Sequence, residues 1–236
     1  MSSSRVIRPV VLAWSGGKDS SLALAALQTD PTIEVVALLT TVTRDYDRIS
    51  MHGVRRSILE AQMSSLGLPL VEATIPALAS NDLYEKAFAS ALAALQHQRP
   101  DVRHLAFGDL FLTDVRAYRE RMLEPLGWTP VFPLWGRDTT QLARQFVDQG
   151  YRAMLTCVDT TQLGAEFAGR EFDGALLDEL PDTVDPCGER GEFHTCVYDG
   201  PIFHRPLALE RRERIRRDER FEYCDLTLSI ADVSTA

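Results

Sequence analysis

The stretch that decides the fold runs from Val10 to Ser21 and reads VVLAWSGGKDSS. It opens with a short, nearly all-apolar run, the pattern of a strand that is covered on both faces of a parallel sheet. Two adjacent glycines follow, and then the segment Ser20–Gln28 has apolar residues at helical spacing. This order of strand, glycine-rich turn and helix favours anion binding, because the turn and the first helical N–H groups can face one ligand.

Units of strand and helix continue along the first two-thirds of the chain. Further strands are expected over residues 33–39, 70–75, 104–107, 129–132 and 151–158, and helices over 53–66, 81–97, 115–126 and 139–149. This alternation predicts an α/β fold with a parallel sheet. Later residues favour short strands and loops, with a hairpin over 207–228. We therefore expect a nucleotide-binding α/β domain over residues 1–158 and a smaller α+β region over residues 159–236.

Composition excludes several classes of protein. With 236 residues, 45% hydrophobic and 25% charged, the chain can bury a sizeable core. Its net charge of −9 is opposite to that of most proteins that hold nucleic acid, so no nucleic-acid partner is expected. No apolar run has the length of a membrane span or a signal-peptide core, so we expect a cytoplasmic protein without membrane contact.

The polar side chains of the glycine-rich turn fit a phosphate ligand. Hydroxyl groups at Ser15, Ser20 and Ser21 can donate to phosphate oxygens, and Lys18 can neutralise charge. Asp19 would repel a bare phosphate, so its natural task is to hold a Mg²⁺ ion that bridges phosphates. The glycine spacing excludes a Walker A loop and a dinucleotide-binding fingerprint. A plain strand-to-helix turn with a serine cap is the alternative interpretation.

Two other strand ends are candidates for nucleotide contacts. Thr40 and Thr41 close the second expected strand, and Gly108 and Asp109 close the fourth. The carboxyl ends of parallel strands form the ligand crevice of such sheets. Gly108 would let the chain pass close to a nucleotide, and Asp109 can contact magnesium or substrate, or simply cap a helix. His52, before the next helix, can face the ligand or lie on the surface.

Residues 15–20 resemble the SGGxDS loop of the ATP pyrophosphatase, or PP-loop, superfamily. In that superfamily the loop binds the β,γ-pyrophosphate of ATP. A substrate oxygen is adenylylated at the α-phosphate, and a nucleophile then displaces AMP. The resemblance implies a HUP-like (adenine nucleotide alpha hydrolase-like) fold, and it implies that Ser15–Ser21, with Gly16 and Gly17, bind ATP.

A second signature lies far along the chain. Gly188–Thr195 reads GERGEFHT, and Asp199–Phe203 reads DGPIF. Together with intermediate segments, these residues resemble the diphthine–ammonia ligase family over essentially residues 10–203, with residues 114–121 and 132–135 more like its bacterial-type members. The resemblance implies a ligase that uses ATP and Mg²⁺, adenylylates a carboxylate and lets ammonia displace AMP. A protein side chain is among the candidate acceptors.

The second signature also supplies candidate catalytic groups. Glu189, Glu192 and His194 can converge on one place, where two carboxylates and an imidazole can orient or deprotonate ammonium. They can equally be solvated acids and an ordinary histidine around a glycine turn. Lys18 is the fourth expected catalytic residue, because its charge can stabilise the leaving pyrophosphate.

Several alternatives remain open at this point. Arg116, Arg119 and Arg121 can meet an acidic substrate or the phosphates, or stay solvated. Thiolation or another modification of RNA could use the same adenylylation step, and Cys157 would then be the best-placed thiol. An ATP-binding protein without turnover is the alternative from a different class. No glutaminase segment is recognisable, so free ammonia is the expected nitrogen source.

Overall fold

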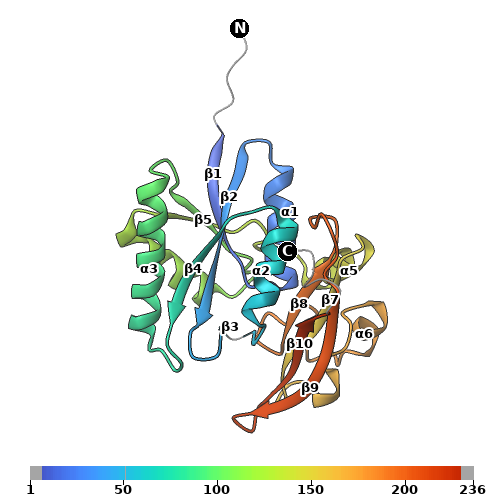
Figure 1. Ribbon diagram of the computed structural model, residues 1–236. Helices are drawn as coiled ribbons and strands as arrows, with labels where there is room; N and C mark the ends of the chain where they lie inside the picture. The colour runs from blue at the N-terminus through green and yellow to red at the C-terminus, as the bar shows by residue number, and fades with distance from the viewer. Residues whose placement is uncertain (1–6, 51, 230–236) are drawn as a thin grey trace.

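The computed structural model describes residues 7–50 and 52–229 and contains two β-sheets (Figure 1). The first sheet is built from β1 (Arg8–Ala13), β2 (Ile33–Thr43), β3 (Arg48–Ile49), β4 (Leu70–Ile75), β5 (His104–Ala106) and β6 (Thr129–Val131). The second is built from β7 (Arg152–Asp159), β8 (Phe193–Asp199), β9 (Leu209–Arg217) and β10 (Phe221–Leu228). The helices are α1 (Lys18–Thr29), α2 (Arg56–Leu66), α3 (Asn81–Gln98), α4 (Thr113–Leu123), α5 (Thr139–Asp148) and α6 (Gly174–Glu179), with 3₁₀ turns η1 (Glu124–Leu126) and η2 (Ala165–Phe167).

The first sheet is parallel around a central β1. Strand β1 pairs with β2 on one edge and with β5 on the other, β4 adds to the far edge of β2, and β6 adds to β5. Only the short β3 is antiparallel, at the end of β2. The carboxyl ends of β1, β2 and β5 therefore meet at one edge, and the predicted α/β domain of HUP type is confirmed.

Helices cover both faces of this sheet and link it to the second one. Val11 of β1 belongs to a core cluster with residues of α3 and α4, whereas its neighbour Leu12 belongs to a cluster with α1 and α2. The latter cluster continues into β7, β8 and β10 of the second sheet. Helices α1 and α2 consequently lie between the two sheets, as Figure 1 shows.

The strand at residues 151–158 was expected to close the parallel sheet, and this prediction is wrong. Strand β7 lies in the second sheet and pairs antiparallel with both β8 and β10. Its residues from Ala153 to Asp159 are all buried, because β7 is a central strand with both faces covered. Such burial produces the same continuous apolar run as a parallel strand. The domain limit at residue 158 stays a prediction, although by its pairing β7 groups with the later strands.

The other expected elements occur with shifted ends. Strand β2 continues to Thr43, because its last residues pair with β4 and β3. Helix α2 begins only at Arg56, after the unpredicted strand β3. The hairpin expected over 207–228 is confirmed as β9 and β10. No helix within the described ranges is long and apolar enough to cross a bilayer.

Gln62 of α2 fastens the glycine-rich loop between the two sheets. Its side chain is fully buried; Nε2 donates to Gly16 O at 3.1 Å and to Val197 O at 2.7 Å, and Oε1 accepts from Trp14 Nε1 at 3.0 Å. Gly16 has a φ of +78°, and a Cβ there would lie 2.8 Å from Gln62 Oε1. Glycine is therefore required both by the backbone conformation and by this close approach.

Replacing Gln62 by leucine should destabilise the fold. The Gln62→Leu variant leaves the Trp14 indole N–H without its acceptor and removes a donor from the Gly16 and Val197 carbonyls. Gly16 O keeps its bond from Val197 N, so the main cost is the buried Trp14 N–H; the total should be about 3 kcal/mol, measured by urea unfolding. The matched control is Gln28→Leu on the exposed side of α1, which should change stability by less than about 0.5 kcal/mol. Equal stability of the two variants would contradict this role of Gln62.

Candidate active site

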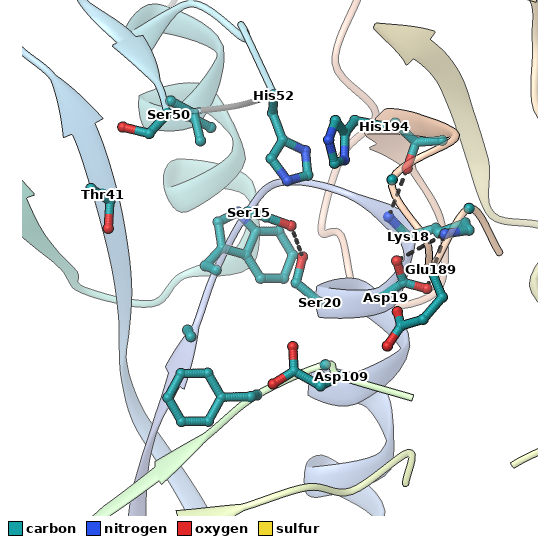
Figure 2. A pocket seen from close by; sticks show the side chains of 18 of the residues that line it. Ser15, Lys18, Asp19, Ser20, Thr41, Ser50, His52, Asp109, Glu189 and His194 are labelled. Atoms are coloured by element: carbon teal, nitrogen blue, oxygen red, sulfur yellow. Dashed lines mark hydrogen bonds and ion pairs between the residues drawn. The ribbon is translucent and has the colours of Figure 1, made fainter. Parts of the chain in front are cut away.

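A cavity of about 340 Å³ opens at the carboxyl edge of the first sheet, within the usual size range of ligand pockets. Its walls come from the loop after β1, the ends of β2 and β5, the connection from β3 to α2, helices α3 and α4, and the turn before β8. The predicted site residues that line it are Ser15, Lys18, Asp19, Ser20, Thr41, His52, Gly108, Asp109, Glu189 and His194. Figure 2 shows the labelled side chains around this space.

Five predicted site residues do not line the cavity: Gly16, Gly17, Ser21, Thr40 and Glu192. The Thr40 hydroxyl donates to Trp14 O at 2.8 Å, and the Ser21 hydroxyl donates to Gly17 O at 3.0 Å. Both side chains therefore hold the shape of the loop rather than face the open space. The side of Gly16 on which a Cβ would lie faces Gln62 of α2, and the corresponding side of Gly17 faces Thr195 of β8.

The loop after β1 presents hydroxyl groups and one turn of helix to the cavity. Ser15 Oγ lies 3.3 Å from Ser20 Oγ and accepts from Gly17 N at 3.3 Å. Lys18 N donates to Thr195 Oγ1 at 3.0 Å, so one of the N–H groups expected to face an anion is already bonded. Gly108 lines the cavity and packs closely against the first turn of α1.

Lys18 is held by the second signature. The residue is 2% exposed, and its amino group lies 2.8 Å from an Asp19 carboxylate oxygen and donates to Cys187 O. Lys18 Nζ lies 5.5 Å from the ring centroid of Phe193 and 5.9 Å from that of Phe172. Burial lowers the pKa of Lys18, but the Asp19 carboxylate, together with Cys187 and Glu189, outweighs burial, and the pKa is raised. The amine is therefore a fixed positive charge in the cavity wall.

Glu189 is the carboxylate of the second signature that faces the cavity. Its Oε1 accepts from Leu110 N at 2.7 Å, which ties the turn before β8 to the segment after β5. Burial raises the pKa of Glu189 to about 7, and the carboxylates of Asp19 and Asp109 add to this. Backbone donation and the Lys18 charge act in the opposite direction. Glu189 can therefore exchange a proton near neutral pH.

Glu192 holds the turn together from inside. It is 1% exposed; one carboxylate oxygen accepts from Asp185 N and the other from Arg190 N, each at 2.9 Å. The structure therefore does not bring Glu192 together with Glu189 and His194 at the cavity. The sequence does not show which of the two glutamates faces the cavity, because each directly follows a glycine of the same turn.

Two imidazole rings in contact, those of His52 and His194, lie above Ser15 and Lys18 in Figure 2. The ring centroids of His52 and His194 lie 4.4 Å apart, with a tilt of 38°. Burial lowers the pKa of His194 to about 4, and burial together with the neighbouring His194 lowers the pKa of His52 well below its usual range. Both rings are therefore neutral at pH 7, and a ring nitrogen of each can accept a hydrogen bond without bringing a charge into the cavity.

The far side of the cavity contains residues that the sequence did not single out. Tyr84 and Phe88 come from α3, and Phe107 directly follows β5. Nothing in the local sequence distinguishes these aromatic residues from core positions. Arg119 of α4 also lines the cavity, and of the three arginines weighed from the sequence only this one does.

Comparisons with known proteins agree with the resemblance seen in the sequence. The family model described as the diphthamide synthase N-terminal domain matches residues 8–130, and that of the diphthamide synthase C-terminal domain matches residues 138–229. Relatives named diphthine–ammonia ligase include one from Schizosaccharomyces pombe, 26% identical over 216 residues. The alignment covers 84% of this chain but 36% of that protein, so the chain spans about a third of the fission-yeast relative.

The alignments with two vertebrate relatives of the same name cover a much larger share of those proteins. The human protein is 24% identical, with 84% of this chain and 82% of the relative aligned. The Danio rerio protein is 25% identical, with 87% and 88% aligned. The expected resemblance is confirmed, whereas placement among bacterial-type members stays a prediction. Because the N-terminal family model alone matches more than half of the chain, the chain belongs to the diphthamide synthase family.

Proposed function

We propose that this protein is an ATP-dependent ligase that converts a carboxylate into an amide with ammonia. The observation that carries the proposal is that four PP-loop residues and the segment with Glu189 and His194 face one cavity; the four are Ser15, Lys18, Asp19 and Ser20. The relatives named diphthine–ammonia ligase support carbon–nitrogen bond formation. Their name specifies diphthine for those proteins; for this chain we propose a carboxylate acceptor, with a protein side chain as candidate.

The cavity fits an ATP substrate in both polarity and shape. The hydroxyl groups of Ser15 and Ser20 now donate within the loop, to Ser20 Oγ and Gly17 O, and would turn to the phosphate oxygens when ATP binds. Lys18 offers a fixed positive charge for the β,γ-phosphates. On the side of β2 and α3 the lining is apolar, with Leu39, Ile49 and Phe88. A flat base would be buried there while Thr41 and Ser50 offer polar contacts.

Asp19 is the proposed ligand for a magnesium ion carried with the nucleotide. Carboxylate oxygens are the protein ligands that Mg²⁺ prefers, and Asp19 lines the cavity beside Lys18. The described part of the chain contains no ready-made group of three ligands, so nucleotide phosphates would complete the coordination. Asp109 also lines the cavity and stays the second proposed contact for magnesium or substrate; each of the two carboxylates has a cation beside it, Lys18 at 2.8 Å from Asp19 and Arg119 at 3.6 Å from Asp109.

The reaction takes place in two balanced steps. An acceptor carboxylate oxygen attacks the α-phosphorus of ATP, the bond to the β-phosphate oxygen breaks, and pyrophosphate leaves from an acyl-adenylate. Ammonia then forms the C–N bond, AMP leaves with the electron pair of the C–O bond, and the nitrogen loses a proton. Lys18 stabilises the negative charge of the pyrophosphate, and Glu189 accepts the proton. The proposed task of His52 and His194 is to orient ammonia as neutral acceptors, and that of Glu192 is to position the turn.

The fate of the α-phosphate tests the proposal directly. With α-³²P-ATP, Mg²⁺, ammonium and cell extract, label should appear in AMP, and Lys18→Ala should lower the rate about a hundredfold. Lys86, on the exposed side of α3, is the matched control, because it is the only other lysine in the chain. Lys86→Ala should behave as wild type. Label in ADP would overturn adenylylation, and tight binding of intact ATP would favour a sensor.

The pH dependence of the rate should report Glu189. Because its pKa is raised to about 7, the carboxylate becomes a base only as pH rises through that value. The rate of AMP release should therefore increase between about pH 6 and 8, and Glu189→Gln should flatten this limb and lower the rate about a hundredfold. The pH at which the rate rises should also shift when one of the charged groups that act on Glu189 is replaced; these are Asp19, Asp109 and Lys18. An unchanged pH profile in Glu189→Gln would rule out this role.

Cys157 provides the test against sulfur transfer. It is buried in β7, burial raises the pKa of its thiol to about 11, and it does not line the cavity. Cys157→Ser should therefore keep AMP formation within about threefold of wild type, because a buried, protonated thiol is not a nucleophile. Loss of most activity together with RNA binding that weakens with salt would support thiolation instead.

A further inference from the structure

Among the residues that the structure describes, Arg119 is the basic side chain that lines the cavity on the side of β5. Its guanidinium is stacked 4.8 Å from the Phe107 ring centroid, and Nη1 donates to the Tyr84 hydroxyl at 3.3 Å. The other two arginines of α4 are engaged elsewhere or exposed. Arg116 lies over Phe132 and Trp135, and Arg121 is exposed at the end of the helix. A guanidinium so held is a rigid, planar donor set.

The partners of Arg119 leave it incompletely bonded. Its Nε lies 3.6 Å from Asp109 Oδ2, and neither atom makes a hydrogen bond. Four buried side-chain atoms in the described part of the chain lack a partner, and three of them belong to residues that line this cavity: His52, Asp109 and Arg119. Nε and Oδ2 face each other as an ion pair that is too long for a hydrogen bond, so the guanidinium keeps donor capacity for an acceptor in the cavity.

The charges of Arg119 and Asp109 determine which kind of ligand can bind beside them. A guanidinium binds a planar oxyanion through parallel N–H donors, as in its pairs with carboxylates. Asp109 beside it cancels much of the positive charge, so a polyphosphate would gain little here, whereas a singly charged carboxylate meets weaker repulsion. The phosphates already have Lys18 and the loop hydroxyls at the end of β1.

Resting on the proposed function, we propose that Arg119 binds the carboxylate of the acceptor, with Asp109 and Tyr84 holding the guanidinium in place. The acceptor would thus contact the side of the cavity formed by β5 and α4, where Tyr84 of α3 and the neighbouring Phe88 also lie. The reacting carboxylate and the α-phosphate would then meet above the first turn of α1.

The experiment separates binding of the acceptor from binding of ATP. Arg119→Gln, Arg119→Lys and the control Arg121→Gln are compared by ATP affinity in calorimetry and by AMP release at saturating ATP with increasing amounts of cell extract. Arg119→Gln should raise the extract concentration for half-maximal rate by about ten- to a hundredfold, the loss expected for hydrogen bonds to a charged group. Its ATP affinity should stay within about threefold, and Arg119→Lys should lie between the two, because lysine keeps the charge without the planar fork.

Each other outcome overturns the assignment in a distinguishable way. If Arg119→Gln also lowers the affinity for ATP to a similar extent, Arg119 contacts the phosphates instead. If the dependence of the rate on extract is unchanged in this variant, Arg119 does not bind the acceptor. Intact ATP affinity in Arg119→Gln also shows that the variant is folded. If the wild-type protein releases no AMP with any extract, the proposed function fails first, and the assignment of Arg119 falls with it.

Discussion

Val197 N donates to Gly16 O at 2.8 Å, and Lys18 N donates to Thr195 Oγ1 at 3.0 Å. These contacts dock the glycine-rich loop on β8, and Gln62 closes the junction from α2. The loop belongs to the first sheet and β8 to the second, so the cavity exists only where the two sheets meet. Lys18 shows the consequence: it starts α1, yet its amino group is held by Cys187 O and faces two phenylalanine rings of the C-terminal region.

The contact between the loop and β8 is a second reason why residues 16 and 17 must be glycine. A Cβ at Gly17 would lie 3.1 Å from Thr195 O, and one at Gly16 would press on Gln62. The usual explanation of such glycines is close approach of backbone N–H groups to an anion. Here the same small residues are required for the loop to contact β8. The signature after β1 and the signature before β8 are therefore two sides of one contact, although they lie far apart in the chain.

Strand and helix periodicity were sufficient to predict the parallel sheet, because β1, β2, β4 and β5 each read as an apolar run followed by a helix. Periodicity failed at β7, whose burial on both faces mimics a parallel strand. Among site residues, Ser15, Lys18 and Asp19 follow from a local motif. Arg119 and Tyr84 do not, because their approach depends on how α3 and α4 pack over the sheet edge. Likewise, only the fold separates Glu189, which faces the cavity, from Glu192, which binds backbone N–H groups.

The distribution of charge in the cavity fits a reaction between an anion and a neutral nucleophile. Two fixed cations, Lys18 and Arg119, stand on different sides, and each has a carboxylate beside it. The tilted pair of His52 and His194 adds no charge, because burial keeps both rings neutral. A protonated histidine there would repel ammonium, the form of the nitrogen source that predominates at pH 7. Neutral imidazoles next to a carboxylate with a pKa of about 7 instead allow the nitrogen to lose its proton inside the site. The strong desolvation that keeps these histidines neutral comes from the same meeting of loop and β8 that shapes the cavity.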